Sequence, residues 1–353
     1  MKSFHLWLFL LLTLISAGCS ASQTENHLSS SQAAATVVSG KIAAMPVNAS
    51  PTSNPRSTAT LSQAGAGSGS PASAPMQTAT ASPPPETVHP TTTGSAPVST
   101  PAPDAWQQMP VIPQVSDSAR QIYQKGLKMG SNPHAFSKVG DCGSTPSWFL
   151  GDFDRGPKYY SLGDYQYLSA VIQQYAGSFG RTSLAAKSGF NASSVFASLW
   201  ADRSQCQVNE TPLACEYRLN KPSIALITLG TNDVWHQDVF ESKMRAIIEY
   251  SIQNGVLPVL ATKADNDEGD GSINATLVRL ANEYDIPLWN YWRAVQTLPD
   301  KGLQPDGAHI TWGPNRFDDP QAMTRGWTIR NLTALQTLDA VWRGVTAQPN
   351  EQP

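Results

Sequence analysis

The sequence predicts an α/β domain built around a parallel β-sheet. Between residues 106 and 345, short apolar runs alternate with longer segments whose apolar residues recur at helical spacing. Such alternation is typical of parallel strands joined by right-handed helical crossovers. Residues 224–229 form a near-continuous apolar run, the pattern of a strand that is covered on both faces. About 240 residues suit one domain of this class.

The expected elements follow one another along the chain. A helix is expected at 117–129, ending at Gly130, and a strand at 135–139, stopped by Gly140. A second helix, with Tyr167 and Leu168 on its apolar stripe, is expected at 165–175. The buried strand at 224–229 precedes a helix at 239–254 with Gly255 as its C′ residue. A strand at 256–261, a helix at 272–284 and a strand at 286–289 complete the pattern.

Composition excludes several function classes. The formal net charge of −3 argues against a strongly basic nucleic-acid-binding protein. Four cysteines are too few for a disulfide scaffold, and they lack the paired spacing of a structural zinc site. There is no glycine-rich nucleotide loop or other cofactor motif, so we expect neither a cofactor nor a bound metal.

The N-terminus indicates export. Residues 1–19 comprise a basic start, an apolar core and the small-residue exit Ser16-Ala17-Gly18-Cys19, as in a signal peptide. The cysteine after two small residues makes this end resemble a bacterial lipobox, although Ser16 stands where leucine is usual. We therefore expect a bacterial protein that is lipid-anchored to the cell membrane through a diacylated Cys19 and lies outside the cytoplasm. The alternative is an ordinary cleaved signal and a secreted protein.

Residues 20–105 are expected to form a disordered tether. The first 105 residues hold only six of the chain's 24 basic and 27 acidic residues, and Ser, Thr, Ala, Pro and Gly dominate after residue 19. Large apolar side chains are nearly absent, so no core can offset the chain entropy of folding. The folded domain is expected at 106–345, followed by a tail at 346–353.

Three polar motifs carry the chemistry. Gly140-Asp141-Cys142-Gly143-Ser144 and Gly230-Thr231-Asn232-Asp233 directly follow expected strands, and Asp306-Gly307-Ala308-His309 lies further on. Ligand sites of open α/β sheets lie beyond the carboxyl ends of the strands. In this order, and with Ser188-Gly189-Phe190-Asn191 between the first two, the motifs resemble those of the SGNH (GDSL-type) hydrolase family over about residues 135–315.

The resemblance implies a three-layer α/β/α sandwich, flavodoxin-like in its sheet, and hydrolysis of acyl esters. By position, His309 is the expected general base and Asp306 the carboxylate that orients it. The expected oxyanion hole consists of the Asn232 side chain and the backbone N–H groups of Gly189 and Cys142.

Cys142 departs from the family pattern because it stands where the nucleophilic serine is expected. A thiol beside an imidazole ionises near neutral pH, so Cys142 qualifies as a nucleophile that forms a thioester. Two alternatives stay open: a degenerate site that only binds, and a structural role for Cys142. Ser144, two residues on, does not replace it, because the shift changes where the side chain lies.

The remaining cysteines bear on this choice. Cys206 and Cys215 flank a polar stretch and are expected to form a disulfide in an oxidising exterior. That pairing leaves Cys142 unpaired, which suits a reactive thiol. In the alternative, Cys142 pairs with one of the two, and a disulfide through Cys142 removes the nucleophile.

Other residues near the motifs have structural as well as functional interpretations. His236 is expected to be a hydrogen-bonded loop residue, and Asp141 to make a structural hydrogen bond in its turn. The acidic segment 265–270 is expected to be a solvated rim, since it lacks the ligand spacing of a calcium loop. Most tryptophans are expected in the core, whereas Trp148, Trp235 and Trp312 lie within a few residues of the motifs, where they can stack on a sugar ring.

Two hypotheses follow. The first is an exported, lipid-anchored hydrolase of acyl esters, acting on a small-molecule or carbohydrate ester through Cys142, His309 and Asp306. The second is a non-catalytic envelope protein that keeps the fold to bind a glycan or a partner. Neither involves nucleic acid, and the sequence does not specify the acyl group, the alcohol or the oligomeric state.

Overall fold

The computed structural model describes residues 104–347. The signal peptide expected at 1–19, with Cys19, nearly all of the tether expected at 20–105, and the tail from residue 348 onward lie outside the described residues. Within the described part, regular elements run from Ala105 to Thr346. None of the helices in this part is long and apolar enough to cross a bilayer.

Four parallel strands form the central sheet, in the spatial order β1 (Asn132–Gly140), β3 (Pro222–Thr228), β4 (Leu257–Ala261) and β5 (Leu288–Trp289). At the carboxyl end of β1, both backbone groups of Gly140 bond to the segment around Ala186, which extends the sheet by a single parallel bridge. If this bridge counts as the second strand, the order is 2-1-3-4-5, that of doubly wound, flavodoxin-like sheets.

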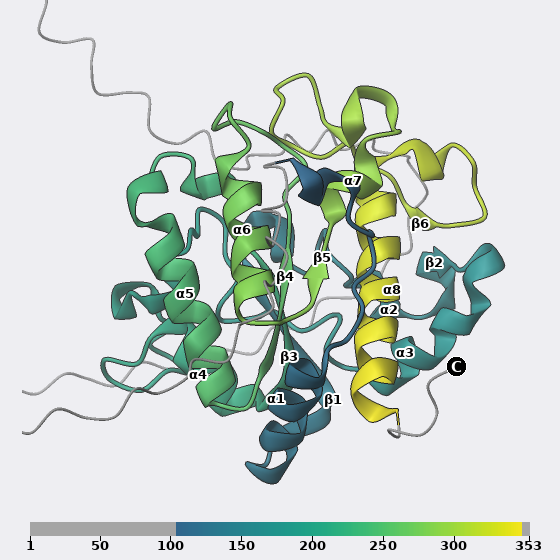
Figure 1. The fold of residues 1–353 in the computed structure, drawn as a ribbon. Coiled ribbons are helices and arrows are strands. Elements are labelled where there is room, and N and C mark those ends of the chain that lie inside the picture. Colours follow the sequence, from purple (N-terminus) through teal and green to yellow (C-terminus); the bar gives the residue numbers. More distant parts are fainter. Residues whose placement is uncertain (1–103, 348–353) are drawn as a thin grey trace, which may run out of the picture. The chain divides into compact units, whose positions relative to one another are not determined.

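Helices cover both faces of the sheet (Figure 1). One hydrophobic cluster packs α1 (Asp117–Lys128), α3 (Ser169–Gln174) and α8 (Gly326–Thr346) on one face. A second cluster packs α4 (Pro212–Asn220), α5 (Gln237–Gln253) and α6 (Ser272–Glu283) on the other. The predicted three-layer α/β/α fold with a parallel sheet is therefore confirmed.

Shorter elements complete the described part. Helix α2 spans Asp152–Arg155 and α7 spans Tyr291–Val295, and β2 (Tyr160–Ser161) pairs in parallel with β6 (Asn315–Arg316). The described loops also contain 3-10 helices at Ala105–Gln108, Cys142–Ser144, Pro157–Tyr159, Gly163–Leu168, Ser194–Phe196, Ser198–Trp200, Thr231–Asp233, Pro299–Gly302 and Ala322–Thr324.

Local signals explain several element ends. The Ser116 side chain caps α1 by accepting a hydrogen bond from the Ala119 N–H at 3.1 Å. Helix α5 stops just before Gly255, which has φ +69°, as expected of a C′ glycine. The space there is also tight, since a Cβ on Gly126 of α1 would lie 1.8 Å from the Gly255 carbonyl oxygen.

Two sequence expectations about helices are wrong or incomplete. Tyr167 does not lie on a buried stripe: its segment is a 3-10 helix and the residue is 50% exposed. The longest helix of the described residues, α8, was not among the expected elements, although it buries Leu332, Leu335 and Leu338.

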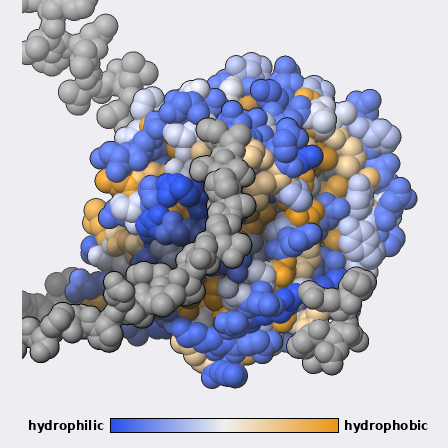
Figure 2. Space-filling model, in the orientation of Figure 1, coloured by the Kyte–Doolittle hydropathy of each residue, from blue (hydrophilic) through white to orange (hydrophobic). Residues whose placement is uncertain are grey.

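The face of the domain in Figure 2 is mainly hydrophilic, with hydrophobic residues scattered among the polar ones.

A buried carboxylate joins α4 to the first strand. The side chain of Glu216 is fully buried and accepts hydrogen bonds from Ser137 Oγ (2.5 Å), Arg181 Nη1 (2.5 Å) and the Leu184 N–H (2.9 Å). These contacts fix the chain just before the bridge at Ala186. Glu216 therefore helps to position the segment that continues to Gly189.

We predict that Glu216→Ala lowers the free energy of unfolding by about 3 kcal/mol or more, because it leaves Arg181 and two other donors without their partner. The exposed carboxylate Glu283, which pairs with Arg245, is the control. Glu283→Ala should cost less than about 1 kcal/mol. Urea unfolding followed by circular dichroism measures both, and equal effects would contradict the role given to Glu216.

Candidate active site

The sheet brings three of the motif positions to one edge. Gly140 lies between Ala186 on one side and Thr228 on the other, and all three segments run in the same direction. Cys142 follows Gly140 by two residues, Gly189 follows Ala186 by three, and Asn232 follows Thr228 by four. In a doubly wound sheet this point, beside the first strand, is where the chain order reverses and ligands bind.

The turn that carries Cys142 is a short 3-10 helix capped by Asp141. The Asp141 side chain accepts a hydrogen bond from the Gly143 N–H at 2.8 Å, the structural role expected for it. Burial raises the pKa of Asp141, and the positive charge of Arg330 opposes this shift. Ser144 is fully buried and its hydroxyl bonds to that of Thr228, so it is not available to attack a substrate.

Gly189 adopts a left-handed backbone conformation. Its φ is +81°, a region that glycine adopts without strain, and a Cβ placed there would meet nothing within 4 Å. The neighbouring Phe190 N–H bonds to Lys187, whereas the Gly189 N–H makes no hydrogen bond within residues 104–347. That group is therefore available to a ligand at the end of β1.

Asn232 lies against the segment of Gly189. Its Nδ2 donates to the Phe190 carbonyl oxygen at 2.9 Å, which uses one of its two protons and leaves the other for a ligand. The next residue strengthens the connection, since Asp233 Oδ1 accepts from the Ala192 N–H at 2.9 Å. The structure thus brings Gly189 and Asn232 together.

Asp306 and His309 form a dyad. The Asp306 Oδ2 and the His309 Nδ1 are 2.7 Å apart, and Asp306 Oδ1 accepts from the backbone N–H groups of Ala308 and His309. The His309 N–H is the main cause that lowers the pKa of Asp306. The contact between His309 Nδ1 and Asp306 Oδ2 holds the imidazole ring in one orientation and directs the other ring nitrogen, Nε2, away from the carboxylate.

The first turns of α8 join the dyad loop to the Cys142 turn. Thr311, two residues after His309, accepts through its hydroxyl from the Gly326 N–H (2.8 Å) and through its carbonyl from the Trp327 N–H (3.0 Å). Four residues after Gly326, the Arg330 Nη1 lies 3.5 Å from where a Cβ of Gly143 would be. Because four helical residues span about 6 Å, α8 holds both loops at neighbouring points.

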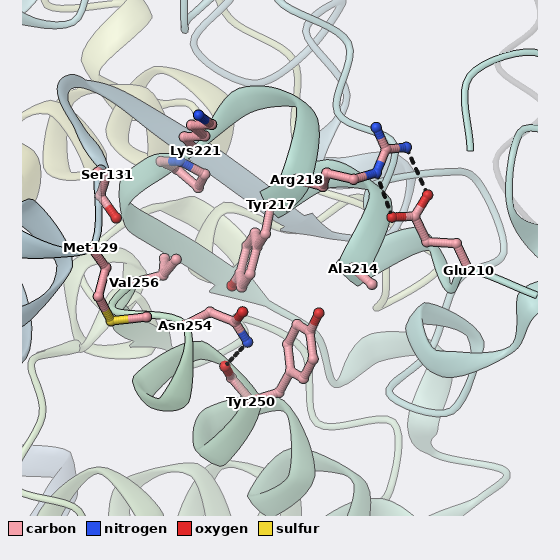
Figure 3. A pocket seen from close by; sticks show the side chains of 12 residues that line it. Met129, Ser131, Glu210, Ala214, Tyr217, Arg218, Lys221, Tyr250, Asn254 and Val256 are labelled. Carbon is pink, nitrogen blue, oxygen red and sulfur yellow. Dashed lines mark hydrogen bonds and ion pairs between the residues drawn. The ribbon is translucent and has the colours of Figure 1, made fainter. Parts of the chain in front are cut away.

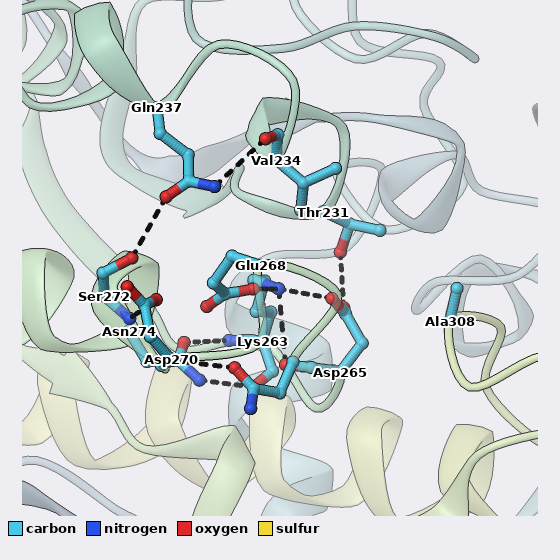
Figure 4. Close-up of polar contacts among 12 residues, drawn as sticks. Thr231, Val234, Gln237, Lys263, Asp265, Glu268, Asp270, Ser272, Asn274 and Ala308 are labelled. Atoms are coloured by element: carbon cyan, nitrogen blue, oxygen red, sulfur yellow. Dashed lines mark hydrogen bonds and ion pairs between the residues drawn. The ribbon is translucent and has the colours of Figure 1, made fainter.

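The acidic segment after β4 is not simply a solvated rim. Asp265 and Glu268 are buried, and both pair with the buried amine of Lys263 (Figure 4). Asp265 also accepts a hydrogen bond from the Thr231 hydroxyl at 2.8 Å. This cluster therefore supports the loop of Asn232 through the bond between Thr231 and Asp265. The expectation of a solvated rim is wrong for Asp265 and Glu268.

The cysteines differ in part from expectation. Cys206 and Cys215 form the expected disulfide, with Cα atoms 5.3 Å apart. Cys142 is also disulfide-bonded, and no cysteine of the described residues is a free thiol. The expectation that Cys142 is unpaired is therefore wrong, and so is the alternative in which it pairs with Cys206 or Cys215. A disulfide sulfur is not a nucleophile, so catalysis by Cys142 first requires reduction.

The three tryptophans that were expected near the motifs, and not in the core, are exposed. Trp235, three residues after Asn232, is 84% exposed, and Trp312, three residues after His309, is 64% exposed. Trp148 is 38% exposed and stacks on Trp327, with ring centroids 5.8 Å apart. The loops that carry the motifs therefore present aromatic surface to solvent.

Two other features of the described residues lie elsewhere. Cys206, Glu210 and Cys215 are close enough to suggest a metal site, but both sulfurs belong to a disulfide. A hollow of about 410 Å³ lies at the amino ends of β1 and β3, lined among others by Tyr217, Lys221 and Tyr250 (Figure 3). Neither contains a residue of the expected site.

Comparisons with known proteins give structural similarity alone. No family model and no curated protein sequence matches the chain. The structure is similar to that of a GDSL-like lipase from Bacteroides thetaiotaomicron, with 16% identity, 63% of this chain and 97% of that chain covered, and a TM-score of 0.38.

Two further solved structures are similar at the same level. One is a catalytic mutant of an acetylxylan esterase from Geobacillus stearothermophilus, with 16% identity, 60% and 97% coverage of this chain and of that chain, and a TM-score of 0.37. The other is a putative lipolytic protein of the G-D-S-L family from Desulfitobacterium hafniense, with 15% identity, 58% and 99% coverage, and a TM-score of 0.35.

Two features of this region could not be recognised from the sequence. Arg330 borders the Cys142 turn, and nothing in its surrounding sequence distinguishes it from a surface arginine. The Lys263, Asp265 and Glu268 cluster was visible only as an acidic segment, because the pairing depends on how the loop folds back on β4.

We predict a pH-dependent effect of Asp233→Asn on stability. Burial raises the pKa of Asp233 to about 6. The folded protein therefore binds this proton more tightly than the unfolded chain, and stability falls as pH rises through the window between about 4 and 6. The neutral variant lacks this loss, so its free energy of unfolding relative to wild type should rise by about 3 kcal/mol between pH 4 and pH 7. A difference that is constant with pH in urea unfolding would contradict the prediction.

Proposed function

We propose that the chain is an exported acyl-ester hydrolase of the SGNH (GDSL) type. Its nucleophile is the thiolate of Cys142 in the reduced protein, its general base is His309, and Asp306 orients the base. Asn232, Gly189 and the N–H of Cys142 form the oxyanion hole. The alcohol part of the substrate is a small molecule or a carbohydrate.

The observation that carries this proposal is the Asp306–His309 dyad. Its 2.7 Å contact occurs in a loop that α8 ties to the Cys142 turn. Gly189 and Asn232 follow the two segments that flank the carboxyl end of β1, and Asn232 bonds to the Phe190 carbonyl, which supports the proposed oxyanion hole. A base with an orienting carboxylate, beside paired amide donors, is the arrangement that acyl transfer requires.

The chemistry follows from these groups. His309 takes the proton of the Cys142 thiol, and the thiolate attacks the ester carbonyl carbon. The resulting oxyanion receives hydrogen bonds from the Gly189 and Cys142 N–H groups and from Asn232. Collapse of this intermediate breaks the bond to the alcohol, which leaves with the proton from His309, and a thioester remains. Water, deprotonated by His309, then hydrolyses the thioester to the carboxylic acid and the thiol.

The proposed substrate class rests on the expected export of the protein and on the exposed aromatic side chains near the site. Trp235 and Trp312, both strongly exposed, follow the loops of Asn232 and His309. Flat aromatic faces at the rim of a site suit the apolar face of a sugar ring. O-acylated carbohydrate of the cell surface or the surroundings is therefore the substrate class that we propose.

A second function is favoured by one observation, the disulfide of Cys142. If this disulfide persists, the chain has no thiol at the site and acts as an envelope protein that binds a glycan or a partner through the same loops. The two functions differ in whether the reduced protein turns over esters.

We predict that the reduced full chain releases acetate from acetylated xylan and from a simple aryl acetate. Cys142→Ala and His309→Ala should abolish turnover, and Asn232→Ala should lower kcat about 10²–10³-fold through loss of one oxyanion donor. Acetate release is measured with and without a phosphine reductant. The Cys142→Ala variant under the same reductant gives the background, and a Cys206→Ser, Cys215→Ser double variant controls for reduction of the other disulfide.

The outcomes separate the hypotheses. Turnover that depends on Cys142 and on reductant supports the hydrolase. Turnover that appears only in Cys142→Ser identifies a disabled esterase. No turnover in any variant contradicts hydrolysis and leaves binding as the function.

Export and lipid attachment are part of the proposal and are supported by residues 1–19. A Cys19 sulfur that carries lipid cannot form a disulfide, so lipid attachment goes with the Cys142 thiol of the proposed hydrolase. We predict that the full chain, expressed in a bacterium, sediments with membranes and incorporates a labelled fatty acid, because two acyl chains on Cys19 anchor stably. Cys19→Ser should remove the label and shift the protein to the soluble fraction. If both proteins are secreted without label, the signal is of the ordinary cleaved kind.

A further inference from the structure

Arg330 is a half-buried cation held against aromatic rings. It lies near the start of α8, and its Cζ is 5.0 Å from the ring centroid of Phe149, 5.3 Å from that of Trp327 and 5.4 Å from that of Tyr291. Contacts of this kind stabilise a guanidinium through its face and leave its N–H edge open for hydrogen bonds.

The N–H groups of Arg330 lack partners among the described residues. Within 104–347 the guanidinium makes neither a hydrogen bond nor an ion pair, and its Nε is buried with no acceptor. Two other arginines differ, since Arg181 pairs with Glu216 and Arg343 pairs with Asp339. The Nη1 and Nη2 groups also lack acceptors among the described residues but, unlike Nε, are not fully buried, so they are the donors that a ligand can reach.

Arg330 borders the turn that carries Cys142. Its Nη1 lies 3.5 Å from where a Cβ of Gly143 would be, so the absence of a side chain at Gly143 keeps the approach to the guanidinium open. The rings around Arg330 belong to the cluster on the α8 face, which also includes Ile310, the residue after His309. Phe190, next to Gly189, belongs to the cluster on the opposite face.

Arg330 therefore lies beside the Cys142 turn, on the face of the sheet that includes Ile310 and opposite the face that includes Phe190. In the proposed reaction, His309 protonates the leaving alcohol, so the alcohol part of the ester occupies this side. The stacked pair of Trp148 and Trp327 continues the same surface, since Trp327 also contacts Arg330.

We propose that Arg330 binds a carboxylate on the alcohol part of the substrate, so that the preferred substrates are acyl esters of acidic alcohols. The planar guanidinium presents parallel N–H donors that match the two oxygens of a carboxylate, and such charge-assisted pairs are among the strongest hydrogen bonds in proteins. This inference rests on the proposed function for the placement of the ester, whereas the anion site itself can be tested without turnover.

A different role for Arg330 is that of a structural counter-charge. Its positive charge acts on the buried carboxyls of Asp141 and Asp265, although neither lies within ion-pair distance. In that role Arg330 affects stability and all substrates alike. Discrimination between a negative and a neutral ligand of the same shape separates the two roles.

The first experiment measures binding by titration calorimetry with the full chain. 3-Acetamidobenzoate carries a carboxylate and an amide in place of the ester, and 3-acetamidobenzamide is its neutral counterpart. Wild type should bind the anion about tenfold or more tightly than the neutral compound. Arg330→Met should lose this preference. Arg343→Met, which removes a ring-stacked arginine from the far end of the same helix, should retain it.

Three results would overturn the inference: equal binding of both compounds by wild type, no detectable binding of the anion, or an unchanged preference in Arg330→Met. Circular dichroism checks that this variant folds. If it does not fold, Arg330→Lys keeps the charge but not the planar pair of donors, and should retain only part of the preference. The comparison of the two compounds with the wild-type protein tests the inference even if no variant folds.

The second experiment separates this inference from the proposed function. The reduced full chain is offered 3-acetoxybenzoate and 3-acetoxybenzamide, and kcat and KM are measured for each. A lower KM for the anion that depends on Arg330 supports both proposals. Hydrolysis of both esters with equal KM sustains the hydrolase and overturns the role of Arg330. No hydrolysis, together with Arg330-dependent binding of 3-acetamidobenzoate, sustains the anion site and overturns hydrolysis.

Discussion

The backbone pairing of Gly140 with two neighbours is the constraint on which the site depends. Its N–H and carbonyl bond to the segment around Ala186, while Thr228 of β3 lies on its other side. A side chain is excluded here, since a Cβ would lie 2.1 Å from the Ser144 hydroxyl and 2.6 Å from that of Thr228. Three loops that are distant in sequence thus leave the sheet at one point.

The buried carboxyl groups near this end of the sheet are each paired with a donor. Each carboxyl that the loops bury has donors of its own: Asp141 has the Gly143 N–H, Asp233 the Ala192 N–H, and Asp265 the amine of Lys263. The bonds of Asp141 and Asp265 are local, whereas that of Asp233 joins two loops; together they fix the shape of the turns without occupying Asn232 fully or Gly189 at all. The groups that shape the loops and the groups offered to a ligand are therefore different ones.

Much of this arrangement could be predicted from the sequence because short-range signals specify it. The apolar run at 224–229, the glycines after helices and the polar motifs after strands gave the parallel sheet and the residues at its edge. Helix α8 was not visible in this way, because buried Thr328, Asn331 and Thr337 interrupt its apolar pattern. Asn331, for example, bonds to the backbone of Leu150 and Trp148, partners about 180 residues away in the sequence.

The separation along the sequence between residues that contact one another also limits how much of the site can be predicted. The Asp306–His309 contact is local, and the resemblance to the SGNH family implied it. The environment of Arg330 is built from Phe149, Tyr291 and Trp327, which lie far apart along the chain, so no sequence window contains it. The disulfide-bonded state of Cys142 was likewise not predicted, because the spacing of Cys206 and Cys215 indicated an unpaired Cys142.

The attachment of both loops to α8 has a consequence for how the protein matures. The strand that precedes Cys142 is near the start of the described residues, whereas α8, which contacts both loops, is the last element among them. During ribosomal synthesis α8 emerges after the strands and loops that it contacts, and contacts across such a separation form late in folding. The two loops therefore lack their common support until α8 itself has been made.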